Sequence, residues 1–362
     1  MPFLPFVAGA GVLGFAAWRL RKSANPVEEE ASAEEVEAAP SAPTLGDVLD
    51  LDEIHVEFAP DLVPMVLDSA TGLDARIDNM RAQIATHFGG ILPEIRLTDD
   101  AGLGAGEYVI RIQGVPQAQD RLDANRVLAL LPTQGGQAIP VGEDVKEPVY
   151  GAPARWLSRA AADDAALAGA TVVNPSEVLA THLLEVIKAN LARLVGMKSL
   201  RRLLDALTTL TDADRADANR RMLADMIPDR VPMEMLLSIV RLLLEERVSI
   251  RNLALILESI AEVRGTGVSP DAICEHVRQK LAFQILADLR AKDGSVPLVQ
   301  LAPEWESTFA AHTLGDGAAP DVALPPDVFQ RLTGAIADKI NAAGDGGHYT
   351  ALVTSSRRRR FM

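Results

Sequence analysis

The chain has 362 residues, 48% of them hydrophobic and 4% aromatic, and its formal net charge at pH 7 is −15. This length predicts two or three folded domains, and the acidic balance excludes a typical nucleic-acid-binding protein, which carries a basic surface. The single cysteine, Cys274, excludes an internal disulfide. Because it falls on a predicted helix face, it is interpreted as a small core residue.

An uncharged stretch, residues 2–18, opens the chain and contains GAGVLG at 9–14, the G-x-G-x-x-G pattern of dinucleotide-binding turns. That pattern indicates a nucleotide site only between a strand and a helix, with an acidic residue about 20 positions later, and this context is lacking. Three cations follow within 19–22. An apolar run followed by cations predicts the end of a transmembrane helix over 1–22, with the following chain in the cytoplasm. A secretory signal peptide would carry its cations before the apolar run.

Residues 23–43 combine acidic residues with Ala, Ser and Pro and contain almost nothing to bury. This composition predicts a flexible, self-repelling linker. Its function is either that of a plain spacer or that of a recruiting segment.

The first folded part is predicted to mix strands and helices. Alternating apolar and polar residues predict a strand over 47–58, which is ended by prolines. Apolar residues at three- and four-residue intervals predict an amphipathic helix over 73–90, which stops at paired glycines. Residues 94–100 and 107–115 are predicted to form a hairpin across a glycine-rich turn, and 126–132 to form another strand.

From residue 176 onward the pattern is helical. Residues 176–196 begin with a capping residue, run at helical period and end at a glycine. The same periodicity predicts further helices at 198–210, 214–226, 232–246, 249–263 and 270–290. Short strands are predicted at 295–301 and 350–354, and the basic run at 357–360 is interpreted as a solvated helix face.

The sequence contains none of the common catalytic, metal-binding or phosphate-binding motifs, so no catalytic residue, metal ligand or cofactor is assigned. His182, inside a predicted helix among leucines, is interpreted as a hydrogen-bonded structural residue. Surface recognition is the remaining class of function. In KEPVYGAPARWL, residues 146–157, two prolines and a glycine are predicted to form a loop that presents Tyr150 and Trp156. Such aromatic residues are enriched as interface anchors. The alternative, preferred for Trp156 and open for Tyr150, is packing onto their own domain.

Several segments together resemble the cytoplasmic portion of the FlhA family, the large export-gate component of flagellar and related type III secretion systems. They are LDARIDNMRAQIATHFGGILPEIRLTDD, GEYVIRIQGV, YGAPARWL, NPSEVLATHLLEVIKANLARLVG and RLLLEERVSIRNLALILESIAE. The resemblance covers nearly the whole chain and implies an α+β region of four subdomains. These are expected at 44–115 plus 176–195, at 116–175 as an insertion, at 196–267, and at 268–362, where the chain stops before the family's final strand and helix.

The resemblance also implies partners and a site. It implies a bacterial inner-membrane protein whose cytoplasmic domains form a ninefold ring and receive export chaperones with their cargo. Further implied partners are the soluble export apparatus, with its ATPase complex and stalk protein, and the other membrane gate subunits. The family's chaperone-docking residues match Glu147, Tyr150 and Thr181, with Glu147 replacing the usual Asp and Tyr150 the usual Phe. For Thr181, the structural alternative is a hydroxyl bond to the preceding helical turn.

Two alternatives stay open. One is the gate of a virulence-type injectisome from the same family, although the long acidic linker and the docking constellation favour the flagellar member. The other is a membrane-tethered enzyme with an unrecognised site within 116–175. An enzyme is expected to show a pocket of convergent titratable groups with perturbed pKa values. A docking platform is expected to show a shallow apolar groove flanked by the three matched residues.

Overall fold

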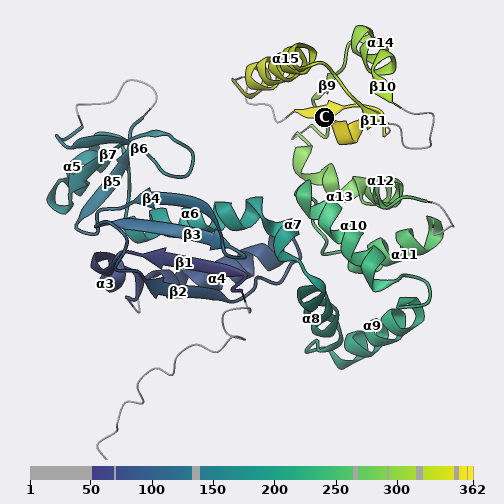
Figure 1. The fold of residues 1–362 in the computed structure, drawn as a ribbon, viewed down its shortest axis with the longest axis horizontal. Helices are drawn as coiled ribbons and strands as arrows, with labels where there is room; N and C mark the ends of the chain where they lie inside the picture. Colours follow the sequence, from purple (N-terminus) through teal and green to yellow (C-terminus); the bar gives the residue numbers. More distant parts are fainter. Residues whose placement is uncertain are drawn as a thin grey trace, which may run out of the picture. The chain divides into compact units, whose positions relative to one another are not determined.

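The computed structural model describes residues 51–68, 71–132, 139–263, 268–291, 293–314, 321–345, 350–356 and 358–361. They belong to one compact unit, Leu51–Met362, which mixes helices and strands (Figure 1). The predicted membrane helix at 1–22 and the linker at 23–43 lie outside the described residues. Within the described ranges, no helix is both long and apolar enough to cross a membrane.

The first sheet has four strands in the order β2-β1-β3-β4. Its strands are β1 (Ile54–Phe58), β2 (Ile95–Asp99), β3 (Glu107–Ile112) and β4 (Val115–Arg121). Alternate residues of the central strand β1 are buried, as its sequence predicts: Ile54, Val56 and Phe58 are at most 2% exposed. Helices α4 (Leu73–His87) and α6 (Pro175–Ala189) contact each other and share a core with this sheet.

The predicted hairpin between 94–100 and 107–115 is wrong, because β1 lies between β2 and β3 and pairs with both. The actual hairpin joins β3 to β4, with Ile112 opposite Val115. Its two turn residues, Gln113 and Gly114, have φ angles of 49° and 77°, as a type I′ turn requires. The sequence pattern did not reveal β4, because this edge strand is polar and largely exposed.

The second sheet, in the order β6-β7-β5-β8, also has four strands. They are β5 (Arg126–Leu130), β6 (Glu143–Lys146), β7 (Pro153–Ser158) and β8 (Thr171–Val173), accompanied by the short helices η2 (Arg159–Ala161) and α5 (Ala162–Leu167). The predicted loop at 146–157 is therefore wrong for half of its length, because only 147–152 lie between the two strands. Trp156 lies in β7 and is 7% exposed, so it packs within its own domain.

The helical part agrees with the predicted periodicity except at two breaks. It comprises α7 (Leu191–Leu194), α8 (Met197–Thr208), α9 (Ala213–Met226), α10 (Met233–Glu245), α11 (Leu253–Val263) and α12 (Pro270–Lys280). The helix predicted at 176–196 breaks at Asn190, whose side-chain amide donates to the carbonyl of Val186 at 2.9 Å. The helix predicted at 270–290 ends at Lys280 and continues as α13 (Ala282–Ile285) and η3 (Ala287–Leu289).

The remaining elements are short, except for α15. They are η1 (Pro60–Leu62), α3 (Val63–Val66), β9 (Leu298–Gln300), α14 (Pro303–Ala311), β10 (Thr313–Leu314), β11 (Asp321–Val322), α15 (Pro326–Asp345), β12 (Ala351–Val353) and η4 (Arg359–Phe361). Strands β9 and β12, both predicted, pair in parallel.

Cys274 is 3% exposed on α12, and burial raises the pKa of its thiol to about 12, which confirms it as a core residue.

The interpretation of 357–360 as a solvated helix face is wrong for the two arginines whose side chains are described. Arg359 forms ion pairs with Glu246 and Glu275, and Arg358 pairs with Glu306. The Arg358 guanidinium also lies 5.3 Å from the centre of the Phe309 ring. The physical reason is that the end of α10, the middle of α12 and helix α14 supply carboxylates and an aromatic face close to this segment, so the charges pair instead of remaining solvated.

Gly89, just after the end of α4, lies against the backbone of Arg251, in the segment between α10 and α11. Its φ is +79°, and the Cβ of an alanine there would lie 2.5 Å from the backbone nitrogen of Arg251. Beside it, the amide of Ile250 donates to the carbonyl of Phe88 at 2.8 Å. We expect Gly89→Ala to lower the free energy of unfolding by more than about 2 kcal/mol, because the left-handed conformation alone costs an alanine roughly 1–2 kcal/mol and the clash adds to it. Urea unfolding measures this change.

Gly114→Ala is the matched control. Gly114 has a φ of +77°, but the nearest atom to an added Cβ is Leu51 Cδ2, at 3.6 Å. This variant should lose only the conformational term of about 1–2 kcal/mol. Equal losses in the two variants would contradict the close contact at Gly89.

Candidate functional site

A six-residue turn, residues 147–152, connects β6 to β7. The two strands are antiparallel, with Lys146 opposite Pro153. The amide of Glu147 donates to the carbonyl of Ala152 at 2.8 Å, and the amide of Gly151 donates to the carbonyl of Glu147 at 2.9 Å. Gly151 has a φ of +67°, which glycine adopts without strain. The backbone therefore closes this turn on itself.

Glu147 lies inside the turn and is only 8% exposed. One of its carboxylate oxygens accepts from the amide of Val149 and the other from the amide of Tyr150, both at 2.8 Å. Such charge-assisted hydrogen bonds satisfy a carboxylate that would otherwise be costly to bury. The carboxylate thus holds the turn in shape and has little surface to offer a partner.

Tyr150 lies at the tip of the turn and is 72% exposed. Partial desolvation and the neighbouring Glu185 carboxylate of α6 raise the pKa of its hydroxyl, and Glu147 adds to this effect while Arg247 opposes it. The hydroxyl that distinguishes this residue from phenylalanine therefore lies close to α6. Glu185 in turn pairs with Lys188, with the Lys188 Nζ at 2.5 Å from a carboxylate oxygen.

Thr181 lies on α6 with its side chain exposed, one helical turn before Glu185. Residues four apart share a helix face, so Thr181 and the Glu185–Lys188 pair belong to one face that Tyr150 adjoins. The Thr181 hydroxyl donates to the carbonyl of Glu177 at 2.8 Å, which is the bond foreseen in the structural alternative. This bond leaves the methyl group free for contact.

His182, the residue after Thr181, is partly buried and belongs to a pair that the sequence did not indicate. Tyr108 on β3 is completely buried, and its hydroxyl oxygen lies 2.7 Å from Nδ1 of His182. The two rings meet edge to face, with centres 5.8 Å apart. His182 is thus hydrogen-bonded, as predicted. The spacing of Thr181, Glu185 and Lys188 could have revealed the α6 face, but no local signal pairs Tyr108 with His182.

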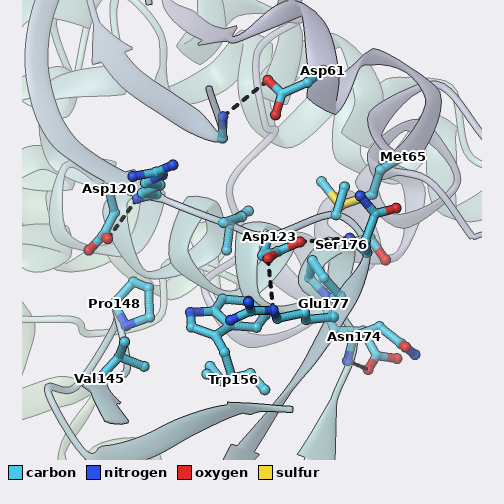
Figure 2. A pocket seen from close by; sticks show the side chains of 18 of the residues that line it. Asp61, Met65, Asp120, Asp123, Val145, Pro148, Trp156, Asn174, Ser176 and Glu177 are labelled. Atoms are coloured by element: carbon cyan, nitrogen blue, oxygen red, sulfur yellow. Dashed lines mark hydrogen bonds and ion pairs between the residues drawn. The ribbon is translucent and has the colours of Figure 1, made fainter. Parts of the chain in front are cut away.

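A polar cavity of about 1020 Å³ lies between elements of the two sheets. In Figure 2, Trp156, Pro148 and Val145 lie on one side of it and Asp61 and Met65 on the other. Some of its charges are paired: Arg126 contacts Asp123 at 3.1 Å and Glu143 at 3.0 Å. The described residues that line it are:
Asp61, Pro64, Met65, Asp68, Thr71, Arg76, Ala105, Gly106, Asp120, Arg121, Leu122, Asp123, Ala124, Asn125, Arg126, Leu128, Glu143, Val145, Lys146, Pro148, Trp156, Arg159, Asn174, Pro175, Ser176 and Glu177.

That lining includes neither His nor Cys, and it does not include Glu147, Tyr150 or Thr181. The cavity therefore lies beside the predicted docking residues and is not formed by them. Two residues that line the cavity, Lys146 and Pro148, flank Glu147 in the sequence, so the cavity reaches this turn without including Tyr150. Among the described residues there is also no group of three or more His, Cys, Asp and Glu side chains suited to a metal ion.

Comparison with solved structures defines the class to which this fold belongs. The Chlamydia pneumoniae CdsV protein, in its complex with CdsO, matches with a TM-score of 0.68 at 21% identity, covering 89% of this chain and 90% of that one. The nonameric EscV cytosolic domain from the type III secretion system matches with a TM-score of 0.60 at 16% identity, covering 89% of both chains. The fold is that of cytosolic domains from type III secretion systems.

The chain belongs to the FHIPEP family, whose model matches residues 1–362. Flagellar biosynthesis protein FlhA from Caulobacter vibrioides is 31% identical over 366 residues, which cover all of this chain and 51% of that protein. These matches confirm the resemblance noted in the sequence. The chain spans about half the length of the curated relatives it matches.

Glu147→Gln tests the role assigned to the carboxylate. The variant keeps the shape of the side chain but turns an NH₂ group toward a backbone amide donor, so one of the two 2.8 Å bonds is lost. We expect the free energy of unfolding to fall by about 1.5–3 kcal/mol, the range for a hydrogen bond to a charged group. Chemical denaturation provides the measurement.

The control is Glu143→Gln, on the adjacent strand. The Glu143 side chain is 68% exposed and pairs with Arg126, itself 42% exposed. Exposed pairs contribute little, so this change should stay below about 1 kcal/mol. A Glu147→Gln variant as stable as this control would show that the turn does not depend on its carboxylate.

Proposed function

We propose that the chain is the cytoplasmic part of a flagellar export gate, and that its turn at 147–152 and the exposed face of α6 dock export chaperones with their cargo. The observation that carries the proposal is Tyr150, which is 72% exposed on a turn held by Glu147 and adjoins the face that bears Thr181 and Glu185. A large aromatic residue on a closed turn provides contact area at little cost in conformational entropy.

Family membership supports the wider assignment. As a gate subunit, the protein resides in the bacterial inner membrane with this region in the cytoplasm, and it has no enzymatic activity of its own. Its further partners are the soluble export apparatus, with its ATPase complex and stalk protein, the other membrane gate subunits, and copies of itself in a nonameric ring. The complex of CdsV with CdsO and the nonameric EscV domain provide precedents from proteins of the same fold.

The flagellar assignment is favoured over an injectisome gate by sequence identity. The Caulobacter vibrioides FlhA is 31% identical to the chain, whereas the CdsV and EscV structures are 21% and 16% identical. An enzymatic site within 116–175 is less well supported. The described residues that line the cavity beside that region include neither His nor Cys, and Arg126 is engaged by Asp123 and Glu143.

Tyr150→Ala is the first test of docking. Titration of the full chain with a cognate chaperone–cargo complex should show affinity at least roughly tenfold weaker than wild type, a loss of about 1.4 kcal/mol, because the aromatic anchor is removed. Leu167→Ala is the control, since Leu167 is 82% exposed on α5, which belongs neither to the turn nor to α6. It should bind like wild type.

Thr181→Met tests the α6 face independently. The added bulk should obstruct contact and weaken binding roughly tenfold, whereas Thr181→Ser keeps the hydroxyl bond to Glu177 and should retain most of the affinity. Equal binding by wild type, Tyr150→Ala and Thr181→Met would reject this site. Failure of the wild-type chain to bind any chaperone–cargo complex would reject the docking function itself.

A further inference from the structure

The C-terminal unit, residues 293–361, lies outside the main hydrophobic core. In chain order, the last buried member of that core is Leu281, and the partly buried hydrophobic residues that pack against it end at Ile285. Among the described residues of the C-terminal unit, the buried hydrophobic side chains are Phe309 on α14 and Leu332 on α15, and neither belongs to that core. Burial of apolar surface therefore contributes little to holding this unit on the helical part.

Arg358 ties the segment after β12 to its own unit. It forms an ion pair with Glu306 of α14, and its guanidinium lies 5.3 Å from the centre of the Phe309 ring, within the range of a cation–π contact. The backbone adds to this order, because the amides of Arg358 and Arg359 both donate to the carbonyl of Ser355, at 2.9 and 3.0 Å. The two arginines are therefore presented from one ordered segment.

Arg359 reaches the helical part. Its guanidinium pairs with Glu246, directly after α10, and with Glu275 in α12, to which its Nε donates. Arg278 of α12 also pairs with Glu246, with its Nη1 at 2.5 Å from a carboxylate oxygen. The four side chains are between 18% and 34% exposed, so this network is less hydrated than an ordinary surface pair. Removal of one member leaves a half-buried charge without its partner, which is costly.

We propose that Arg358 and Arg359 form an ionic strap that fixes the C-terminal unit against α10 and α12, and that the unit is released when the ion pairs of Arg359 are broken. Salt screens such pairs, whereas it does not weaken the packing of a buried apolar core. Release therefore frees the unit as a body while the main core stays intact, as in a hinged domain. This inference does not depend on the proposed docking function.

A distance between spin labels on the two parts tests the strap in the full chain. The only cysteine, Cys274, is 3% exposed and burial raises the pKa of its thiol to about 12, so introduced cysteines are labelled selectively. Gln279→Cys on α12 and Asp338→Cys on α15 place the labels at exposed positions. The distance distribution should be narrow at about 0.1 M salt and broader at about 1 M, where the Debye length falls from about 10 Å to about 3 Å.

Variants of Arg359 separate the charge from the shape of the side chain. Arg359→Gln removes the charge and keeps a long polar side chain, so the distribution should already be broad at about 0.1 M salt. Arg359→Lys keeps the charge and should stay closer to the unsubstituted strap. Arg331→Gln is the control, because it changes an exposed arginine of α15 outside the strap, and it should leave the distribution unchanged.

Hydrogen exchange provides a second measurement, which needs no label. The amide of Arg359 donates to Ser355 at 3.0 Å, and the amide of Phe361 donates to the carbonyl of Arg358 at 2.9 Å. In Arg359→Gln these amides should exchange at least roughly tenfold faster, because the charge-assisted hydrogen bonds that hold the segment are lost. Amides of α10, which belongs to the main core, should keep their wild-type rates and so report that the variant is folded.

Three results would each overturn the proposal. They are a distribution that does not change between the two salt concentrations, equal distributions for Arg359→Gln and Arg359→Lys, and wild-type exchange rates for the Arg359 and Phe361 amides in Arg359→Gln. The salt comparison uses the unsubstituted strap alone, so it gives an answer even if Arg359→Gln fails to fold.

Discussion

Burial of one face of α6 is the constraint on which the candidate site depends. Val178, Leu179 and Leu183 are at most 3% exposed and pack into the core shared with α4 and the first sheet. Because successive helical residues are rotated by about 100°, fixing this face also fixes where the other side chains project. Thr181 is directed to the surface, and His182 lies against Tyr108. A site placed by a buried helix has its geometry before a partner arrives.

In the turn at 147–152, a buried carboxylate holds the backbone and an exposed aromatic ring is available for contact. Glu147 is 8% exposed and Tyr150 is 72% exposed, although only two residues separate them. Burial of the carboxylate is tolerated because two backbone amides satisfy it. Recognition by this surface would then rest on the Tyr150 ring, the Thr181 methyl group and the Glu185–Lys188 pair, while Glu147 acts through the backbone it holds.

Helices were predicted well, because the spacing of their apolar residues is visible within a short stretch of sequence. The apolar residues of α4, Leu73, Ile77, Met80 and Ile84, are all buried at the predicted spacing, and its end lies at the paired glycines. Strand pairing was predicted poorly, because the choice of partner depends on burial across the whole sheet. The central position of β1 between β2 and β3 is an example, and so is the polar edge strand β4. The division into four subdomains stays an interpretation of the sequence.

Local patterns were sufficient for the helical segments, and the resemblance of several segments to a known family supplied Glu147, Tyr150 and Thr181 as candidates. The direction of each side chain, the pairing of Tyr108 with His182 and the ion pairs of Arg358 and Arg359 depend on tertiary packing. Tyr108 and His182 are 74 positions apart, and Arg359 and Glu275 are 84 apart. No local pattern encodes such pairs, because they form only where folding brings buried polar groups and charges together and removes the water that would otherwise satisfy them.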